Sequence, residues 1–365
     1  MSMQWKSAAL AAALAGGLAS AAWADDVRIA GNMPLSGPVA AYSGNYFKGF
    51  ELGLQDACKA RSVSCDQFKL DAQDNAGKPM QALSVGQKQM LDSPTVMVSG
   101  TSEDSQAIAP LVGKAGIPHF VIAFDAFLVE RNKDMLRVLP NFKVESLQYA
   151  RFIDKVKPKS IVAIALNNAA NNEMFEAVVG GEIKKRGISY THIPFDFGTQ
   201  DYNSLVLKAK DINPDLYIVS GYSFQLYPLL KAIRTYGIPS DKVIAAMDFV
   251  DLLYNGTSRD ELKGFYFTTP LFEVPGAPKQ AADFRARYKA AYGKDPSYVE
   301  AYAYDTAGII VAAQAKSGNT TKESLMGATP YDGASGPIQL DKFGDIMGTV
   351  TVAQIGPDGN VVEVK

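Results

Sequence analysis

Residues 27–60 read VRIAGNM (27–33), PLSGP (34–38) and, after a short link, YFKGFELGLQDACKA (46–60). The first run is short and apolar, which is typical of a buried strand. In the last run Phe47, Phe50, Leu54 and Ala57 recur at spacings of three and four residues, which predicts a helix. A strand that passes through a Pro- and Gly-containing loop into a helix is the first half of a βαβ unit.

The same unit recurs along the chain. Strands are predicted at 68–72, 95–99, 118–123, 160–166, 189–194, 216–220 and 243–247, with helices at 79–91, 105–115, 172–186, 202–211 and 224–236. Short apolar strands that alternate with helices indicate parallel sheets covered on both faces. The two runs of this pattern predict an α/β fold of two doubly wound, Rossmann-like lobes.

The C-terminal third predicts how the lobes are joined. A strand at 264–271 leads out of the second lobe, and the helices at 279–292 and 299–315 have no sheet of their own, so they should return to the first. The Gly-rich passage 333–352 could then cross back, which gives three crossover strands. We expect lobe 1 to hold residues 25–140 plus 272–337, and lobe 2 residues 141–271 plus 338–365. Ligands bind α/β sheets at the carboxyl ends of the strands, so the cleft between the lobes is the expected site.

The N-terminus predicts export. Lys6 precedes an apolar, Ala-rich run at 8–22, and Ala22-Trp23-Ala24 has the small-x-small pattern of a signal peptidase site. Residues 1–24 should be a signal peptide cleaved after Ala24, since the run is too short and too rich in Ala and Gly to span a membrane comfortably. We therefore expect a periplasmic protein, for which cytosolic ATP or NAD would be out of reach.

The charge of the chain limits its possible partners, and its cysteine content suggests a disulfide. Lys6 is the only charged residue of 1–24, so the mature chain keeps 35 of the 36 basic residues against 38 acidic ones, a net charge of −3. That weak charge argues against nucleic acid or an anionic membrane as partner. An oxidising compartment favours a disulfide between Cys58 and Cys65, with two free thiols as the alternative.

The chain shows no catalytic motif. It has no P-loop, no G-x-G-x-x-G after a strand, no H-E-x-x-H and no G-x-S-x-G. His119 and His192 lie in or beside predicted strands, which favours structural roles, and the adjacent acids Glu103 and Asp104 are typical of solvated or helix-capping residues. We therefore expect neither an enzyme nor a cofactor or metal, although a secreted carboxylate hydrolase is an alternative.

Polar and aromatic residues gather just past the strand ends. In the first lobe these are Tyr42 after PLSGP, the hydroxyl-rich segment 100–105, and Ala123-Phe124-Asp125. In the second lobe they are Asn171, Tyr222 and Asp248. The hydroxyls and free N–H groups at the start of the helix after residue 101 could hold a ligand carboxylate. Simple N-capping by Asp104 or Ser105 is an alternative that does not exclude it.

In its sequence motifs the chain resembles the branched-chain amino acid ABC transporter substrate-binding proteins, which are type I periplasmic binding proteins. The matching segments are MPLSGPVAAY at 33–42, GFELGL at 49–54, DAQD at 71–74, GIP at 116–118, LRVLP at 136–140, PDLY at 214–217, AYD at 303–305 and GPIQLD at 336–341. The resemblance implies a monomeric extracytoplasmic protein. It would deliver a small polar ligand, an amino acid or a similar compound, to ABC permease subunits by cleft closure.

The resemblance also implies roles for site residues. Ser102 matches a residue that binds the ligand carboxylate, and residues 123–125 match the segment that contacts carboxylate and ammonium. Tyr222 matches an aromatic residue that closes over the ligand, and Asp248 an acid that pairs with the ammonium. Tyr42 matches an aromatic wall of the side-chain pocket, and Asn171 a further contact.

Two positions depart from the family pattern. Asp125 stands where Ser, Thr or Asn is usual, and Asn171 where Tyr is common. A desolvated carboxylate beside a bound carboxylate would repel it by a few kcal/mol, on the order of a buried charge pair. Either Asp125 points away, or the ligand is not a standard aliphatic amino acid, and a cation or a donor-rich ring would suit the acids and aromatic walls. An aromatic acid, an amide or an amine is therefore the alternative class of ligand. A role as the ligand sensor of a receptor is the other alternative to transport.

Overall fold

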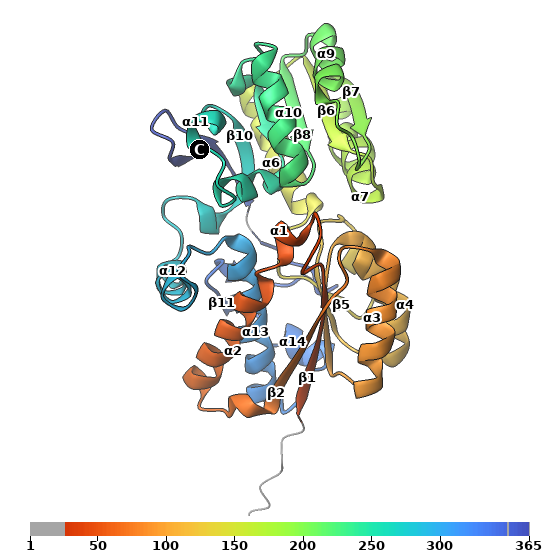
Figure 1. Cartoon of the computed structure of the whole chain (residues 1–365), viewed down its shortest axis with the longest axis vertical. Helices are drawn as coiled ribbons and strands as arrows, with labels where there is room; N and C mark the ends of the chain where they lie inside the picture. Colours follow the sequence, from red (N-terminus) through yellow and green to blue (C-terminus); the bar gives the residue numbers. More distant parts are fainter. Residues whose placement is uncertain (1–25, 349, 365) are drawn as a thin grey trace, which may run out of the picture.

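The computed structural model describes residues 26–348 and 350–364, except for the side chains of Ala41 and Tyr42. The predicted signal peptide and its cleavage site lie outside the described residues. The chain forms two lobes, each built on its own sheet (Figure 1). No helix of the described part has the length and apolar character of a membrane span.

The first lobe has a five-stranded, fully parallel sheet in the order β2-β1-β3-β4-β5. Its strands are β1 (Val27–Met33), β2 (Phe68–Asp74), β3 (Val96–Gly100), β4 (His119–Ile122) and β5 (Met135–Leu136). Side chains alternate between its two faces, so Ile29 packs in the same cluster as Phe50, whereas Ala30 packs in the cluster of Ile108.

The second lobe has a seven-stranded sheet in the order β14-β13-β10-β9-β8-β6-β7. Its strands are β6 (Ser160–Leu166), β7 (Ser189–Phe195), β8 (Leu216–Ser220), β9 (Val243–Ala245), β10 (Tyr266–Pro270), β13 (Val350–Ile355) and β14 (Val361–Glu363). β13 and β14 run antiparallel to their neighbours, and a separate short ribbon pairs β11 (Tyr331–Asp332) with β12 (Pro337–Ile338). The predicted fold of two doubly wound lobes is confirmed.

Helices cover both sheets. Those after a strand of lobe 1 are α1 (Ala40–Ser43), α2 (Tyr46–Arg61), α3 (Pro79–Gln89), α4 (Ser102–Ala115) and α5 (Leu128–Arg131). Those of lobe 2 are α6 (Phe142–Val156), α7 (Ala169–Asn172), α8 (Val179–Lys185), α9 (Tyr202–Ile212), α10 (Ser223–Thr235) and α11 (Arg259–Leu262). The helix predicted at 172–186 is α7 and α8 with a π-helical stretch, Glu173–Val178, between them.

The C-terminal helices pack on the helices of lobe 1. They are α12 (Lys279–Tyr292), α13 (Tyr298–Ser317) and α14 (Lys322–Met326), and α13 lies along α2 (Figure 1). The approach is close enough that a Cβ at Gly49 would collide with the backbone of Glu300, and one at Gly53 with the backbone of Tyr304. The two glycines of the GFELGL segment are therefore required by helix packing.

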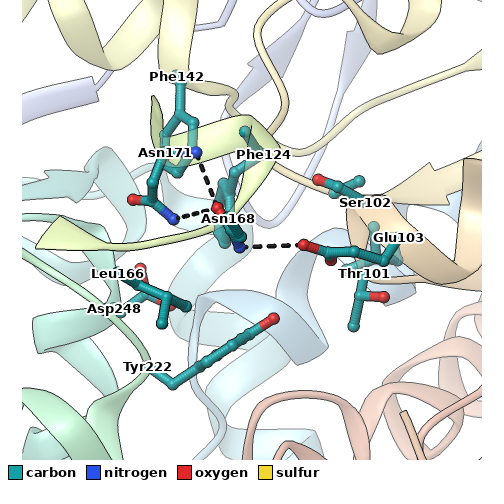
Figure 2. Close-up of a pocket in the computed structure, with 14 residues that line it drawn as sticks. Thr101, Ser102, Glu103, Phe124, Phe142, Leu166, Asn168, Asn171, Tyr222 and Asp248 are labelled. Carbon is teal, nitrogen blue, oxygen red and sulfur yellow. Dashed lines mark hydrogen bonds between the residues drawn. The ribbon is translucent and has the colours of Figure 1, made fainter. Parts of the chain in front are cut away.

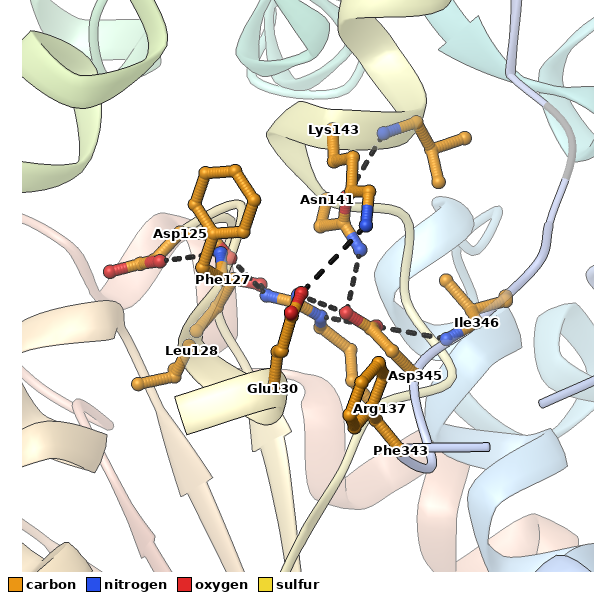
Figure 3. A network of polar contacts seen from close by, with 12 residues as sticks. Asp125, Phe127, Leu128, Glu130, Arg137, Asn141, Lys143, Phe343, Asp345 and Ile346 are labelled. Atoms are coloured by element: carbon orange, nitrogen blue, oxygen red, sulfur yellow. Dashed lines mark hydrogen bonds and ion pairs between the residues drawn. The ribbon is translucent and has the colours of Figure 1, made fainter. Parts of the chain in front are cut away.

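Arg137 links two of the segments that connect the lobes, the one that contains Arg137 itself and the one that contains Asp345 (Figure 3). Its guanidinium donates to both oxygens of Asp345, at 2.9 and 2.6 Å, and to the carbonyl oxygens of Ala123 and Asp125, at 2.7 Å each. Asn141, at the start of α6, donates to the same Asp345 carboxylate at 3.0 Å. One buried cluster therefore holds the first and third connections together with the segment after β4.

Further contacts indicate where the third connection between the lobes crosses. The N–H of Arg137 donates to the carbonyl of Gly344 at 2.9 Å, and Lys322 donates to the carbonyl of Phe343 at 2.6 Å. Residues 343–345 are thereby attached to lobe 1, which favours a third crossing after Ile346, late in the predicted passage 333–352, over the predicted boundary between residues 337 and 338. The predicted lobe boundaries, including the one at residue 338, stay a prediction.

Cys58 and Cys65 form a disulfide with their Cα atoms 5.6 Å apart, next to the end of α2. We expect neither cysteine to be labelled when the native protein is alkylated without reductant and analysed by mass spectrometry. Reduction should lower the free energy of unfolding by only about 2–3 kcal/mol, because a short closed loop restricts the unfolded chain less than a long one. Full labelling of both cysteines in periplasmic material would contradict the bridge.

Candidate functional site

A cavity lies between the two lobes (Figure 2). Lobe 1 contributes Thr101, Ser102, Glu103, Ile122, Ala123 and Phe124, and lobe 2 contributes Phe142, Leu166, Asn168, Ala170, Asn171, Gly221, Tyr222 and Asp248. Most of these residues follow the carboxyl ends of strands, where doubly wound sheets place their ligands. The cavity volume is about 40 Å³, so the lobes are closed around a narrow space.

The structure brings most of the predicted site together. Ser102, Ala123, Phe124, Asn171, Tyr222 and Asp248 all line this cavity. Tyr42 lies in α1, and its side chain is outside the described part of the chain. That these residues contact a ligand stays a prediction.

The side chain of Asp125, which was predicted to belong to the site, points away from the cavity. Its carboxylate accepts the N–H of Phe127 at 2.9 Å and the side-chain amide of Gln106 at 3.1 Å, and it does not line the cavity. Of the two explanations for this unusual acid, the contacts favour the one in which it points away. Phe124 instead faces the cavity and stacks on Phe142, with ring centroids 5.7 Å apart.

The start of α4 is held by Thr101 and not by the residues predicted to cap it. The hydroxyl of Thr101 accepts the N–H of Asp104 at 3.1 Å, so the helix begins at Ser102 and neither Asp104 nor Ser105 is the cap. Thr101 has a φ of 56°, a strained value for a β-branched residue, as is common beside binding sites. Ser102 accepts the N–H of Asp125 at 3.2 Å, which leaves its hydroxyl proton to donate to a ligand.

Asparagines organise the side contributed by lobe 2. Asn168 caps α7 by accepting the N–H of Asn171 at 2.9 Å, and its own amide donates across the cleft to Glu103 at 3.0 Å. Asn171 accepts the hydroxyl of Ser220 at 2.8 Å. Asn171 is therefore fixed within lobe 2, and Asn168 links the lobes.

Tyr222 and Asp248 bring two buried polar groups to the cavity. Tyr222 stacks on Phe224, with ring centroids 5.9 Å apart, and burial, then the charges of Glu103 and Asp248, raise the pKa of its hydroxyl well above the usual range. Burial raises the pKa of Asp248 to about 8, and the nearby charge of Glu145 adds to the effect. An acid with this pKa needs a positive partner to be charged at neutral pH.

Glu103 is the main residue that the sequence-based prediction misread. It was expected to be solvated or capping, yet it is partly buried, lines the cavity and bonds to the opposite lobe. Burial and then the charge of Asp125 raise its pKa. With Asp248 it gives the cavity two carboxylates, and the lining residues include no Lys, Arg or His.

His119 has the surroundings of a structural residue. His119 is buried on β4 and hydrogen-bonded through Nε2 to Ser99 at 2.6 Å, and burial lowers its pKa to about 3. The described residues hold no cluster of His, Cys, Asp and Glu that could bind a metal ion. A second cavity of about 370 Å³ adjoins the first and shares five lining residues with it: Thr101, Glu103, Leu166, Asn168 and Tyr222.

Comparisons with known proteins agree on one family. The family model described as "Periplasmic binding protein" matches residues 26–360. The Leu/Ile/Val/Thr-binding protein of Salmonella typhimurium is 25% identical over 350 residues, which are 93% of each chain.

Solved structures share the fold. The branched-chain amino acid transporter substrate-binding protein of Streptococcus pneumoniae, in complex with isoleucine, superposes with a TM-score of 0.79 at 20% identity, over 93% of this chain and all of that one. An ABC transporter solute-binding protein of Rhodopseudomonas palustris, in complex with 4-hydroxybenzoate, gives a TM-score of 0.80 at 17% identity, over 93% and 96% of the two chains.

Proposed function

This chain belongs to the periplasmic binding protein family, and on that premise we propose that it captures a small organic solute in the periplasm and delivers it to the permease subunits of an ABC importer. The observation that carries the proposal is the cavity lined by both lobes, because only a ligand held by both can stabilise a closed form. Binding without catalysis accounts for the site, and a monomer suffices for this role.

The charge of the cavity favours a ligand with an amino group. Relatives of this fold hold isoleucine in one case and 4-hydroxybenzoate in another. A purely anionic ligand would lie beside Glu103 and Asp248 with no cationic side chain to neutralise it. An ammonium could instead pair with Asp248, and Ser102 could serve any ligand oxygen. We therefore propose an amino acid or an amine over an aromatic acid.

Two contacts across the cleft would hold the closed form together. Glu103 accepts the amide of Asn168, and Arg131 of lobe 1 donates to both oxygens of Glu173 of lobe 2 at 2.5 and 3.4 Å. The cavity of about 40 Å³ has room for only a few water molecules, although a cavity of about 370 Å³ adjoins it, so a wider opening of the cleft would let a solute the size of an amino acid reach Asp248. Opening would bend residues 139–142, 269–271 and the connection near residue 346.

A thermal-shift screen followed by solution scattering tests this function. A screen over amino acids, amines, amides and aromatic acids should find a compound that stabilises the protein by about 2.7 kcal/mol at 100 times its Kd. The same compound should reduce the radius of gyration, because it shifts the open form to the closed one. A compound that binds without changing the scattering profile would argue against cleft closure. A screen without any stabilising compound would argue against solute binding.

A further inference from the structure

Glu103 gives the ligand cavity a second carboxylate whose role the proposed function leaves open. It lies in the first turn of α4 in lobe 1, whereas Asp248 is the second residue of the 3₁₀ segment Met247–Leu253 of lobe 2. Figure 2 shows the two on opposite sides of the cavity, with Asn168 and Tyr222 between them. The two acids therefore face a bound molecule from two directions.

Among the described residues that line the cavity, no cationic side chain neutralises either carboxylate. Glu103 accepts a hydrogen bond from Asn168 at 3.0 Å and one from its own backbone N–H, although a carboxylate can accept about four. Asp248 is 6% exposed, and its carboxylate accepts its own backbone N–H, whereas no hydrogen bond from a side chain of the described residues reaches it. Buried polar groups in stable complexes are almost always paired, so the ligand is expected to supply the missing donors.

The two acids have separate surroundings. Burial is the main cause of the raised pKa in both, and the additional charge comes from Asp125 for Glu103 but from Glu145 for Asp248. The same cavity is also lined by the apolar side chains of Ile122, Leu166 and Phe124. The cavity thus offers two acceptor sites together with apolar walls.

We propose that the ligand carries two cationic or N–H-donating groups at the ends of a short apolar body, one bound by Asp248 and the other by Glu103. This inference rests on the proposed function and narrows its substrate class to diamines and to amino acids with a second amino group. An amino acid with a single ammonium should bind more weakly than one with a second ammonium, since its carboxylate at Ser102 would lie next to Glu103 with no ammonium there to offset the repulsion.

Matched pairs of ligands test the inference in the wild-type protein by calorimetry. α,ω-Diamines of about three to six carbons are compared with the monoamines of equal length, and L-ornithine with L-norleucine, which has a methyl group in place of the terminal ammonium. We expect ornithine, and at least one diamine, to bind roughly 10- to 100-fold more tightly than its partner, as for a charge-assisted hydrogen bond.

A variant then assigns the preference to Glu103. Glu103→Gln keeps an oxygen for Asn168 and removes the charge. The advantage of the second ammonium should therefore fall below about threefold, while the affinity for the monoamines should change by less than about threefold. Glu176→Gln is the matched control, because this acid lies in lobe 2 with its side chain 69% exposed. It should keep the full preference.

Several results would overturn the two-group ligand. Norleucine and the monoamines could bind as tightly as their partners, Glu103→Gln could keep the preference, or no diamine could bind at millimolar concentration. If another solute still closed the cleft, the proposed function would stand without this inference. The ligand comparison in the wild-type protein decides the question even if the variant does not fold.

Discussion

Replacing Arg137 with methionine should lower the free energy of unfolding by about 3–5 kcal/mol, which is the effect of removing one partner from a buried ion pair. Arg137 has no exposed surface, and its guanidinium makes four hydrogen bonds, two to Asp345 and one each to the carbonyls of Ala123 and Asp125. The substitution removes the cationic partner of the Asp345 carboxylate, which keeps only the hydrogen bonds from Asn141 and the N–H of Ile346, and it takes a donor from two buried carbonyl groups. Chemical denaturation followed by circular dichroism measures the change.

Arg186→Met is the matched control. Arg186 also forms a two-pronged ion pair, with Asp154 at 2.8 and 3.1 Å, but its side chain is 27% exposed and that of Asp154 is 60% exposed. Surface pairs of this kind contribute about 0–1 kcal/mol. Equal losses in the two variants would show that the Arg137 cluster is no more than an ordinary ion pair.

The same cluster shows what the sequence could not predict. Asp345 lies 208 residues from Arg137, and nothing in the local pattern of either residue indicates its partner. The strands β1, β6 and β8, by contrast, were predicted to the residue, because each is a short apolar run bounded by polar or turn-forming residues. Local periodicity therefore determines the helices and strands of the lobes. The contacts that hold the connections between the lobes together are long-range, and local periodicity does not reveal them.

The candidate site was predictable to a similar degree. Ser102, Tyr222 and Asp248 were found because they directly follow strands in a doubly wound fold. Glu103 follows Ser102, but whether it faces solvent or the cavity depends on where α4 begins, and that is set by the hydroxyl of Thr101.

Asn168 was missed for a different reason. Four asparagines occur at 167, 168, 171 and 172, and the sequence does not tell which one crosses the cleft. Only the contact with Glu103 identifies Asn168.

Asp248→Asn should weaken the binding of an amine ligand about 10- to 150-fold, which corresponds to the loss of about 1.5–3 kcal/mol for a hydrogen bond to a charged group. Asparagine keeps the shape of the side chain, and Asp248 lies at the cavity and outside the hydrophobic core clusters, so the variant should remain folded. Asp125→Asn is the control, because its carboxylate is bonded to Gln106 and the N–H of Phe127 and is turned from the cavity. It should change the affinity less than about threefold if Asp125 has no charge contact with the ligand.

The pH dependence of binding gives a second signature of Asp248. In the closed, ligand-free protein its pKa is about 8, raised by burial and then by Glu145, so at pH 7 most of these carboxyl groups hold a proton. An ammonium pairs with the charged form and lowers that pKa, so binding releases a proton. Affinity should therefore rise with pH by up to about tenfold per unit below pH 8, and should level off above it.

Calorimetry in buffers of different ionisation enthalpy counts the protons released. Asp248→Asn should abolish the release attributable to this carboxyl, whereas Glu103→Gln should keep it, because burial and the Asp125 charge raise the pKa of Glu103 independently. Proton uptake on binding, or a release that survives in Asp248→Asn, would show that another group pairs with the ligand. Affinity independent of pH would mean that Asp248 is already charged in the open form, so that closure of the empty cleft, and not binding, is the step that takes up the proton.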